Sequence, residues 1–506
     1  MTKRESDIAG TGVAGLDDIL GGGLPRDRLY LLQGDPGVGK TTLGLQFLLE
    51  GRRCGEPVMY VTLSETRSEI EAVARSHGWS LENVHVCELT GNYTLTSSDN
   101  TLFHPDEVEL QETTRVLLAE FDRVQPRRAV VDSLSELRLL TQSMRRYRRE
   151  VLALKQHLAG KDCTVLLLDD RTAEVGGEKH LQSIVHGVIT MEQRTPEYGS
   201  DRRRLRVLKL RAVDYQGGFH DFVIEPGGIQ VFPRLVAADH QDTGHRGTLP
   251  SGVEEIDAML GGGLDRGTAT LVTGPAGSGK SALATQYAMA AAARGERSAM
   301  FLFDERKATV FARARALGMD LDKAVADGMV LVRQVDPAEL GPGEFVATVR
   351  EAVEVHGARV LVIDSINSYL QAMPEERFLN VQMHELLTYL GRRNVTTLLV
   401  LAQHGFLGAG MQTPVDMSYL ADTVILLRYF EAGGAIHKAV SVVKKRSGAH
   451  EATIRAYSLG PSGLSVGKPL REFHGVLTGV PTFHGDPEQL RGLQENLRLP
   501  LQVPHR

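Results

Sequence analysis

Short β-branched and aliphatic runs alternate with longer helical stretches along this chain. The run "LYLLQG" (29–34) precedes a helical pattern that begins at Lys40, and "PVMYVTL" (57–63) follows that pattern. Runs that are apolar throughout are typical of strands buried on both faces, and helices between them predict parallel strand pairs. The pattern therefore predicts an α/β fold, with a mainly parallel sheet flanked by helices.

The same pattern occurs twice, and over the first part of each copy the spacing is constant at 240 residues. The segment "TGVAGLDDILGGGLPRDRLYLLQGDPGVGKTTLGLQF" (11–47) aligns with "SGVEEIDAMLGGGLDRGTATLVTGPAGSGKSALATQY" (251–287). The spacing still holds at Glu65 and Glu305, but Asp132 and Asp364 are 232 residues apart, because the first copy carries about eight extra residues in between. One structural unit has thus been duplicated within the chain.

The repeat predicts two domains, residues 1–242 and 243–484, followed by a C-terminal tail over 485–506. The segment "PRLVAADHQDTGHRGTLP" (233–250) is polar and reads as the linker between them. The end of the chain is punctuated by glycine and proline, which indicates a tail without regular structure.

Composition narrows the choice of function. The net charge of −6 gives no overall attraction to nucleic acid or anionic membranes, so the basic runs Arg145–Arg149 and Arg202–Arg211 are interpreted as solvated faces or subunit contacts. The chain starts without a signal peptide and has no apolar run near the ~18 residues of a membrane span, so we expect a cytoplasmic protein that binds no membrane. Its three isolated cysteines predict neither disulfides nor a zinc site.

Both copies contain the P-loop pattern G-x-x-x-x-G-K-[ST], after a predicted strand and before a helix. Its glycines let backbone N–H groups converge on phosphate oxygens at a helix N-terminus, and its lysine reaches the β- and γ-phosphates. Two such matches in the same context predict ATP binding by both copies. The expected ATP-binding residues are Gly34, Asp35, Pro36, Gly37, Val38, Gly39, Lys40, Thr41 and Thr42 in the first copy, and Gly274, Pro275, Ala276, Gly277, Ser278, Gly279, Lys280, Ser281 and Ala282 in the second.

Hydroxyl and carboxylate groups near each P-loop predict a Mg²⁺ site. The hydroxyls belong to Thr41 and Ser281, and the carboxylates of Asp132 and Asp364 each end an apolar strand. This is the setting of an aspartate that holds Mg²⁺ in P-loop proteins, although an aspartate after a strand can also cap a helix.

Two further carboxylates are candidates for catalysis. Glu65 and Glu305 follow the next strand of each copy, where a carboxylate can orient the attacking water or hydroxyl. Alternatively, each carboxylate only interacts favourably with the dipole at the N-terminus of the helix that it begins.

A basic pair recurs late in each copy. Lys209 and Arg211 match Lys444 and Arg446, and alternate positions on a strand would turn both members of a pair to one side. In a ring of subunits, such a pair would reach the γ-phosphate bound by a neighbour and stabilise charge that develops during transfer. The alternative is an exposed strand edge kept soluble by its charges.

With these residues assembled, the chain resembles the KaiC family, tandem RecA-like ATPases and autokinases of the circadian clock. The resemblance spans nearly the whole length, from "TGVAGLDDILGGGL" (11–24) to "REFHGVLTGVPTFHG" (471–485), and includes "DTVILLRYFE" (422–431). It implies two tandem RecA-like P-loop NTPase domains in a hexameric double ring, with ATP and Mg²⁺ between subunits. It also implies slow ATP hydrolysis by the first ring and autophosphorylation in the second.

The same resemblance suggests roles for individual residues. Asp304 matches the general base for phosphorylation, with Glu305 as its acidic neighbour, and Ser418 matches one of two adjacent phosphoacceptors. The chain departs from the family at Ser64, where the first ring has another glutamate, and at Tyr419, where the second acceptor is threonine. We expect Ser418 to be the principal acceptor, and the role to be signalling or clock-type regulation with KaiB-like or two-component partners.

Other functions stay open at this point. A RecA-like helicase or recombinase shares the P-loop core, but it usually adds basic DNA-binding loops or a separate domain, and none is visible here. A KaiC-like ATPase without kinase activity would leave Ser418 unmodified. A scaffold whose nucleotides only hold a ring together would lose nothing measurable when Glu65 and Glu305 are replaced.

Overall fold

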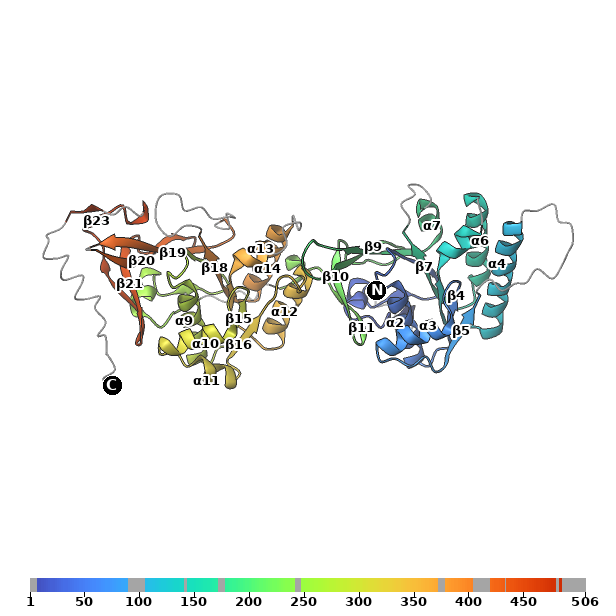
Figure 1. The fold of residues 1–506 in the computed structure, drawn as a ribbon, viewed down its shortest axis with the longest axis horizontal. Coiled ribbons are helices and arrows are strands. Elements are labelled where there is room, and N and C mark those ends of the chain that lie inside the picture. The colour runs from blue at the N-terminus through green and yellow to red at the C-terminus, as the bar shows by residue number, and fades with distance from the viewer. Residues whose placement is uncertain are drawn as a thin grey trace. The chain divides into compact units, whose positions relative to one another are not determined.

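The computed structural model describes residues 7–89, 105–140, 143–171, 178–241, 247–371, 378–403, 419–432, 434–478 and 482–484. The chain divides into two compact units, residues 1–234 and 235–506 (Figure 1). Each unit is described by itself below. Within these residues no helix is both long and apolar enough to cross a membrane.

The first unit is built around one large sheet, which has nine strands within the described residues, in the order β11-β10-β9-β8-β3-β7-β6-β4-β5. The pairs from β8 to β5 are parallel and those from β8 to β11 antiparallel. The elements are β1 (Ile8–Ala9), α1 (Leu16–Ile19), β2 (Leu24–Pro25), β3 (Leu29–Gly34), α2 (Lys40–Arg53), β4 (Val58–Thr62), α3 (Arg67–Ser76), β5 (Val84–Glu88), α4 (Pro105–Val124), β6 (Arg128–Asp132), α5 (Leu134–Leu139), α6 (Met144–Leu158), β7 (Thr164–Asp170), α7 (Glu178–Ile184), β8 (Gly187–Arg194), β9 (Arg202–Leu210), β10 (His220–Glu225) and β11 (Gly228–Phe232).

The side chains of successive residues in the central strands are buried on opposite faces of this sheet. Leu32 packs in the cluster beneath α2 and α3, whereas its neighbour Leu31 packs with α4, α6 and α7. Figure 1 shows these two helical layers on either side of the strands. Burial on both faces explains why the strands are apolar at every position rather than at every second one.

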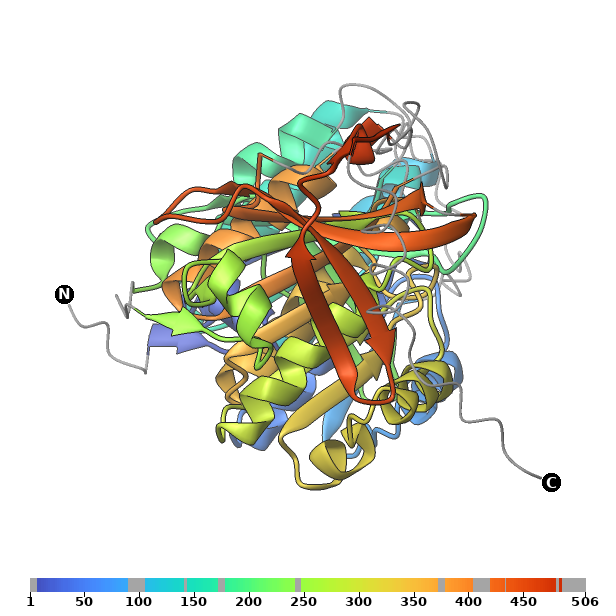
Figure 2. The same cartoon turned by 90° about the vertical axis from the view of Figure 1, so that its left-hand side faces the viewer.

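The second unit repeats this arrangement, with the strand order β16-β15-β17-β18-β14-β19-β20-β21-β22. Figure 2 shows its β21–β22 hairpin in dark orange and red at one edge of the sheet. The elements are η2 (Ala237–Asp239), β12 (Thr248–Leu249), α8 (Glu254–Met259), β13 (Leu264–Asp265), β14 (Ala269–Gly274), α9 (Lys280–Ala293), β15 (Ser298–Leu302), α10 (Lys307–Ala316), α11 (Leu321–Ala326), β16 (Val330–Gln334), α12 (Pro342–Glu354), β17 (Val360–Asp364), α13 (Ile366–Gln371), α14 (Leu379–Arg392), β18 (Thr396–Ala402), β19 (Thr423–Ala432), β20 (Ala435–Lys445), β21 (Ile454–Gly460), β22 (Gly463–Pro469), β23 (Phe473–His474), η3 (Val476–Thr478) and β24 (Thr482–Phe483). The predicted α/β class, with two mainly parallel sheets flanked by helices, is confirmed.

The repeated "LGGGL" sequence makes the same turn in both units. Its third glycine has φ 134° at Gly23 and 124° at Gly263, a region that side chains rarely adopt. A Cβ atom there would lie 2.4 Å from the Ala9 carbonyl oxygen in the first unit and 2.6 Å from that of Leu249 in the second. Close approach of two backbones therefore explains why glycine stands at this position in both copies.

The first part of the segment predicted as a linker packs on the second unit. Leu235 and Ala237 are buried in its core, and the Ala237 N–H donates to Glu385 Oε2 at 3.0 Å. The His240 ring packs against Tyr389 on α14, with ring centroids 4.6 Å apart. Residues 235–240 thus form part of the second domain's own packing.

A buried histidine fixes the chain near the end of the first unit. The Arg234 N–H donates to His220 Nδ1 at 2.9 Å, so the neutral ring carries its proton on Nε2, which lies 3.1 Å from the Gln216 carbonyl oxygen. Burial lowers the pKa of His220 to about 4. The folded first unit therefore favours the neutral ring.

This histidine predicts a loss of stability in mild acid. The folded-state pKa of His220 lies below the ordinary value of about 6.5. The contribution of His220 to the free energy of unfolding is therefore complete above pH 6.5 and is lost as the pH falls from there toward 4. We expect the free energy of unfolding of the first unit to be about 2 kcal/mol lower at pH 5 than at pH 7.5 on account of this group. Urea titrations followed by Trp79 fluorescence measure it, and an equal acid loss in His220→Gln would contradict the assignment.

Candidate nucleotide sites

The two P-loops have similar backbone angles at their inner glycines. In the first unit the loop leaves β3 at Gly34 and enters α2 at Lys40; in the second it leaves β14 at Gly274 and enters α9 at Lys280. The inner glycines have φ 78° and 108° in the first loop and 73° and 107° in the second. Each loop therefore presents a helix N-terminus and the backbone turn that a phosphate group requires.

The P-loop lysines have different partners in the two units. Lys40 Nζ donates to the carbonyl oxygens of Gly34 at 3.1 Å and Asp35 at 2.9 Å, and it lies 2.6 Å from Asp170 Oδ1 at the end of β7. Lys280 Nζ donates to the Pro275 carbonyl oxygen at 2.8 Å. Burial lowers the pKa of Lys280, and the charge of Asp364 partly opposes this.

The residues expected to hold Mg²⁺ lie together in both units. In the first, Thr41 Oγ1 and the Tyr60 hydroxyl both donate to Asp132 Oδ2, at 2.8 Å and 2.5 Å. Burial raises the pKa of Asp132, and these two hydrogen bonds oppose that shift. A hydroxyl beside a carboxylate is the hard-oxygen set that Mg²⁺ prefers, so these residues fit the ion.

The corresponding carboxylate of the second unit is Asp364. Burial raises its pKa, and a hydrogen bond from Ser281 opposes the shift. The peptide bonds Asp132–Ser133 and Asp364–Ser365 are both cis. At the 240-residue spacing Met300 stands where the first unit has Tyr60, so the second carboxylate has no phenol partner there.

Glu65 lies between β4 and α3 and has an unpaired carboxylate oxygen. Its backbone N–H donates to Thr62 Oγ1 at 2.9 Å, and Thr66 begins α3 as the N-cap in a capping box with Glu69. Glu65 Oε2 is buried and has no hydrogen-bond partner among the described residues. Burial raises the pKa of Glu65, and repulsion from Asp132 and Glu69 raises it further. A free, basic carboxylate beside the expected metal site suits a group that orients water.

The two carboxylates of the second unit are engaged differently. Both oxygens of Glu305 accept hydrogen bonds from Arg313 Nη1, at 2.5 Å and 2.7 Å. The exposed Asp304 accepts from Ser365 Oγ at 2.5 Å and from the Ser368 hydroxyl. The first unit has Val73 in place of Arg313, so within the part of the chain that the structure describes Glu305 is held in an ion pair and Glu65 is not.

Each basic pair lies at the opposite end of the sheet from the P-loop of its own unit. Lys209 donates to the carbonyl oxygens of Gln182 at 2.5 Å and Val185 at 2.7 Å, close to the amino end of β3. The P-loop follows the carboxyl end of this six-residue strand, about 17 Å away. Lys209 and Arg211 are thus remote from the phosphate cradle of the same unit.

The second unit shows the same separation. Lys444 donates to the Ala421 carbonyl oxygen at 2.8 Å, and Arg446 donates to that of Tyr419 at 2.6 Å. These contacts lie at the amino end of β14, where the Asp422 N–H donates to the Ala269 carbonyl oxygen. The prediction that both members of a pair lie on the strand was wrong, because β9 and β20 end at Leu210 and Lys445 and leave each arginine one residue beyond.

A model of the KaiC ATPase family matches residues 9–236 and again residues 249–471. This chain is a member of the KaiC ATPase family. The circadian clock oscillator protein KaiC of Synechococcus elongatus is 27% identical to it over 487 residues, which cover 93% of this chain and 91% of that protein. KaiC of Acaryochloris marina is 26% identical over the same length, and KaiC3 of Synechocystis is 26% identical over 499 residues, or 96% of both chains. The predicted resemblance and the tandem RecA-like fold are confirmed.

Three side chains in these KaiC-family sites were not predicted from the sequence. Tyr60 and Arg313 give no sequence signal, because their partners become visible only when strands and helices are packed. Asp170 could have been found: "TVLLLDD" (164–170) is an apolar strand that ends in carboxylates, as the strand before Asp132 does. The proposed acceptor Ser418 lies outside the described residues, and Tyr419 beside it is 55% exposed.

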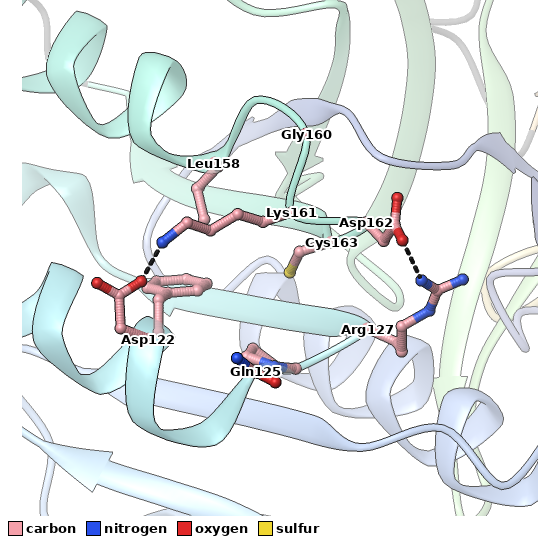
Figure 3. Close-up of a pocket in the computed structure, with 10 residues that line it drawn as sticks. Asp122, Gln125, Arg127, Leu158, Gly160, Lys161, Asp162 and Cys163 are labelled. Atoms are coloured by element: carbon pink, nitrogen blue, oxygen red, sulfur yellow. Dashed lines mark hydrogen bonds and ion pairs between the residues drawn. The ribbon is translucent and has the colours of Figure 1, made fainter.

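A pocket of about 400 Å³ in the first unit is not part of the nucleotide site. It lies between the carboxyl ends of α4 and α6, beside the amino ends of β6 and β7 (Figure 3). Its rim carries an ion pair between Lys161 and Asp122 and another, at 3.2 Å, between Arg127 and Asp162. At the position of Gly160 the second unit has Arg392, which donates to the carbonyl oxygens of residues 238 and 240. In the second unit residues 235–240 thus pack against α14, the helix that corresponds to α6.

Proposed function

We propose that this chain forms a KaiC-type double ring, a homo-hexamer that binds Mg-ATP between neighbouring subunits in both tiers. The supporting observation is the distance between each P-loop and the basic pair of its own unit. A complete site needs both groups, and cyclic symmetry brings the basic end of one subunit to the P-loop end of the next. The ATPase family of the chain and its two matched P-loops support the same proposal.

The proposed roles of the residues follow from their contacts. The P-loop amides and the two P-loop lysines bind the phosphates, and Mg²⁺, when bound, neutralises charge on them. Thr41 with Asp132, and Ser281 with Asp364, orient the oxygen ligands of the ion. Glu65 accepts the proton of the attacking water in the first site, through its unpaired Oε2.

In the second domain we propose serine autophosphorylation with Asp304 as the proton acceptor. Asp304 already accepts hydrogen bonds from two serine hydroxyls, so its position suits a hydroxyl as well as water. The neighbouring Glu305 is paired with Arg313, which holds its carboxylate turned to the arginine. Ser418 is the proposed acceptor, and the output is signalling or clock-type regulation through KaiB-like or two-component partners.

Two measurements on the purified full-length protein test this proposal. Light scattering in saturating Mg-ATP gives the number of subunits, and a monomer would overturn the ring. Intact-mass spectrometry with and without ATP, with phosphosite mapping and Ser418→Ala, gives the kinase activity and its acceptor. Unmodified protein after incubation would leave an ATPase without kinase activity, and unchanged phosphate incorporation in Ser418→Ala would overturn the assignment of Ser418.

Glu65→Gln and Asp304→Asn should separate the two activities. We expect Glu65→Gln to slow ATP hydrolysis in the first domain by about 10²-fold, because it removes the proton acceptor. Asp304→Asn should lower self-phosphorylation by about 10²-fold and leave most of the ATPase activity. Phosphate release and ³²P incorporation measure the two effects.

Two exposed carboxylates, Glu69 on α3 and Asp322 on α11, serve as controls. Glu69→Gln and Asp322→Asn each remove one negative charge outside the proposed machinery, and both should retain both activities. Equal loss of hydrolysis and phosphorylation in Glu65→Gln and in Asp304→Asn would contradict the proposed division of labour.

A further inference from the structure

Asp170 distinguishes the first nucleotide site from the second. It ends β7, the strand beside the P-loop strand, and its carboxylate lies 2.6 Å from Lys40 Nζ. The lysine side chain is 7% exposed and the carboxylate 34%. At the same register position the second unit has Ala402, opposite Gly274 as Asp170 is opposite Gly34. The second site therefore contains no carboxylate at this point.

The position of Asp170 is fixed by the fold. The Asp170 N–H donates to Ser135 Oγ at 2.9 Å, and the preceding Asp169 accepts from Ser135 and Gln33, both at 3.1 Å. The second unit anchors its strand in a similar way, since the Ala402 N–H donates to Asn367 Oδ1 at 2.8 Å. The two strand ends are thus held alike, and they differ in the charge that they present to the P-loop lysine.

The hydrogen-bonding capacity of the two lysines differs as a result. A lysine ammonium has three N–H donors, and those of Lys40 face the carbonyl oxygens of Gly34 and Asp35 and the carboxylate of Asp170. Lys280, among the described residues, donates to Pro275 alone. A phosphate oxygen that reaches Lys40 must replace one of three partners, whereas Lys280 has donors to spare.

We propose that Asp170 is a specificity-determining residue that competes with the nucleotide phosphates for Lys40 and makes the first site the weaker ATP site. The two carbonyl groups belong to the P-loop backbone and cannot leave, so Asp170 is the partner that yields. Its repulsion acts most strongly on a nucleotide that brings a γ-phosphate to the lysine. This inference rests on the proposed nucleotide-binding role of both P-loops.

Reciprocal substitutions test the inference in the full-length protein. Lys280→Ala serves as a background in which only the first site binds nucleotide. In this background Asp170→Asn should tighten the binding of fluorescent ATP by about tenfold, which lies between the effects of exposed and buried ion pairs. The binding of fluorescent ADP should tighten by less. In a Lys40→Ala background, which leaves the second site, Ala402→Asp should weaken ATP binding by about tenfold, and Ala402→Asn should not. Asp162→Asn, the same change of charge before the other end of β7, should match its parent.

The outcomes separate this inference from the proposed function. Unchanged or weaker ATP binding in Asp170→Asn, or equal tightening of ATP and ADP, would overturn the role of Asp170, because a purely structural effect does not distinguish the γ-phosphate. If Ala402→Asp does not fold by circular dichroism, Asp170→Asn and its control still decide. If neither parent binds ATP, the nucleotide-binding proposal itself fails, and the role of Asp170 fails with it.

Discussion

Arg211→Ala and Arg446→Ala are each expected to slow ATP turnover in their own domain by about 10³-fold. A cation that meets the transferring phosphoryl group stabilises charge that is larger in the transition state than in the ground state. Both arginines are exposed at the amino end of their sheets, so their removal should hardly change folding. Turnover is measured with the other domain silenced by substitution of its P-loop lysine.

Two comparisons make this expectation specific. Arg127→Ala and Arg359→Ala remove other arginines at the amino ends of the same sheets, and they should retain turnover. Mixed rings test whether the arginine acts at a neighbour's site. With the second domain silenced, rings that combine Arg211→Ala subunits with Lys40→Ala subunits should recover part of the ATPase activity that each variant lacks alone. Absence of any recovery would contradict a role of the arginine at a neighbour's site.

Arg128→Ala should lower the free energy of unfolding of the first unit by about 3–5 kcal/mol. Its side chain is 1% exposed and lies 4.9 Å from the Phe47 ring centroid. The guanidinium donates to Glu56 Oε2 and to the Gly10 carbonyl oxygen, both at 2.5 Å, and to that of Phe47 at 3.1 Å. Truncation would leave these acceptors without their donor and open a cavity beside α2.

Denaturation followed by Trp79 fluorescence measures this loss, because the single tryptophan lies in the first unit. Arg127→Ala, which removes the neighbouring surface arginine, should change the free energy of unfolding by less than about 1 kcal/mol. Arg128→Met keeps much of the volume and should fall between the two. A loss in Arg128→Ala no larger than in Arg127→Ala would contradict the energetic role of the buried guanidinium.

The repeat explains how much of the fold could be predicted from sequence. Two aligned copies of "LGGGL" and of the P-loop fix the same turn and the same helix start in both units, because glycine and the P-loop lysine have strict local requirements. Asp132 and Asp364 follow from strand ends in the same way. These signals are local, and local geometry is what a sequence pattern encodes best.

The remaining features of the site depend on packing between distant segments. Arg313 reaches Glu305 from within α10, Tyr60 reaches Asp132 across neighbouring strands, and Asp170 reaches Lys40 from β7. A pattern of residues along the chain does not show which distant side chains will come into contact. The ends of β9 and β20 were also misjudged, because each strand pairs with its neighbour through a β-bulge and stops before the arginine.

The packing of residues 235–240 determines where the two repeats can be cut apart. A fragment that begins at residue 243 would lack Leu235 and Ala237 and the hydrogen bond to Glu385, and it would expose the Tyr389 ring that His240 covers. A fragment that begins at residue 234 would keep these contacts. Although the sequence places this short segment at the end of the first repeat, any rearrangement that transfers the second repeat to another protein must carry it along.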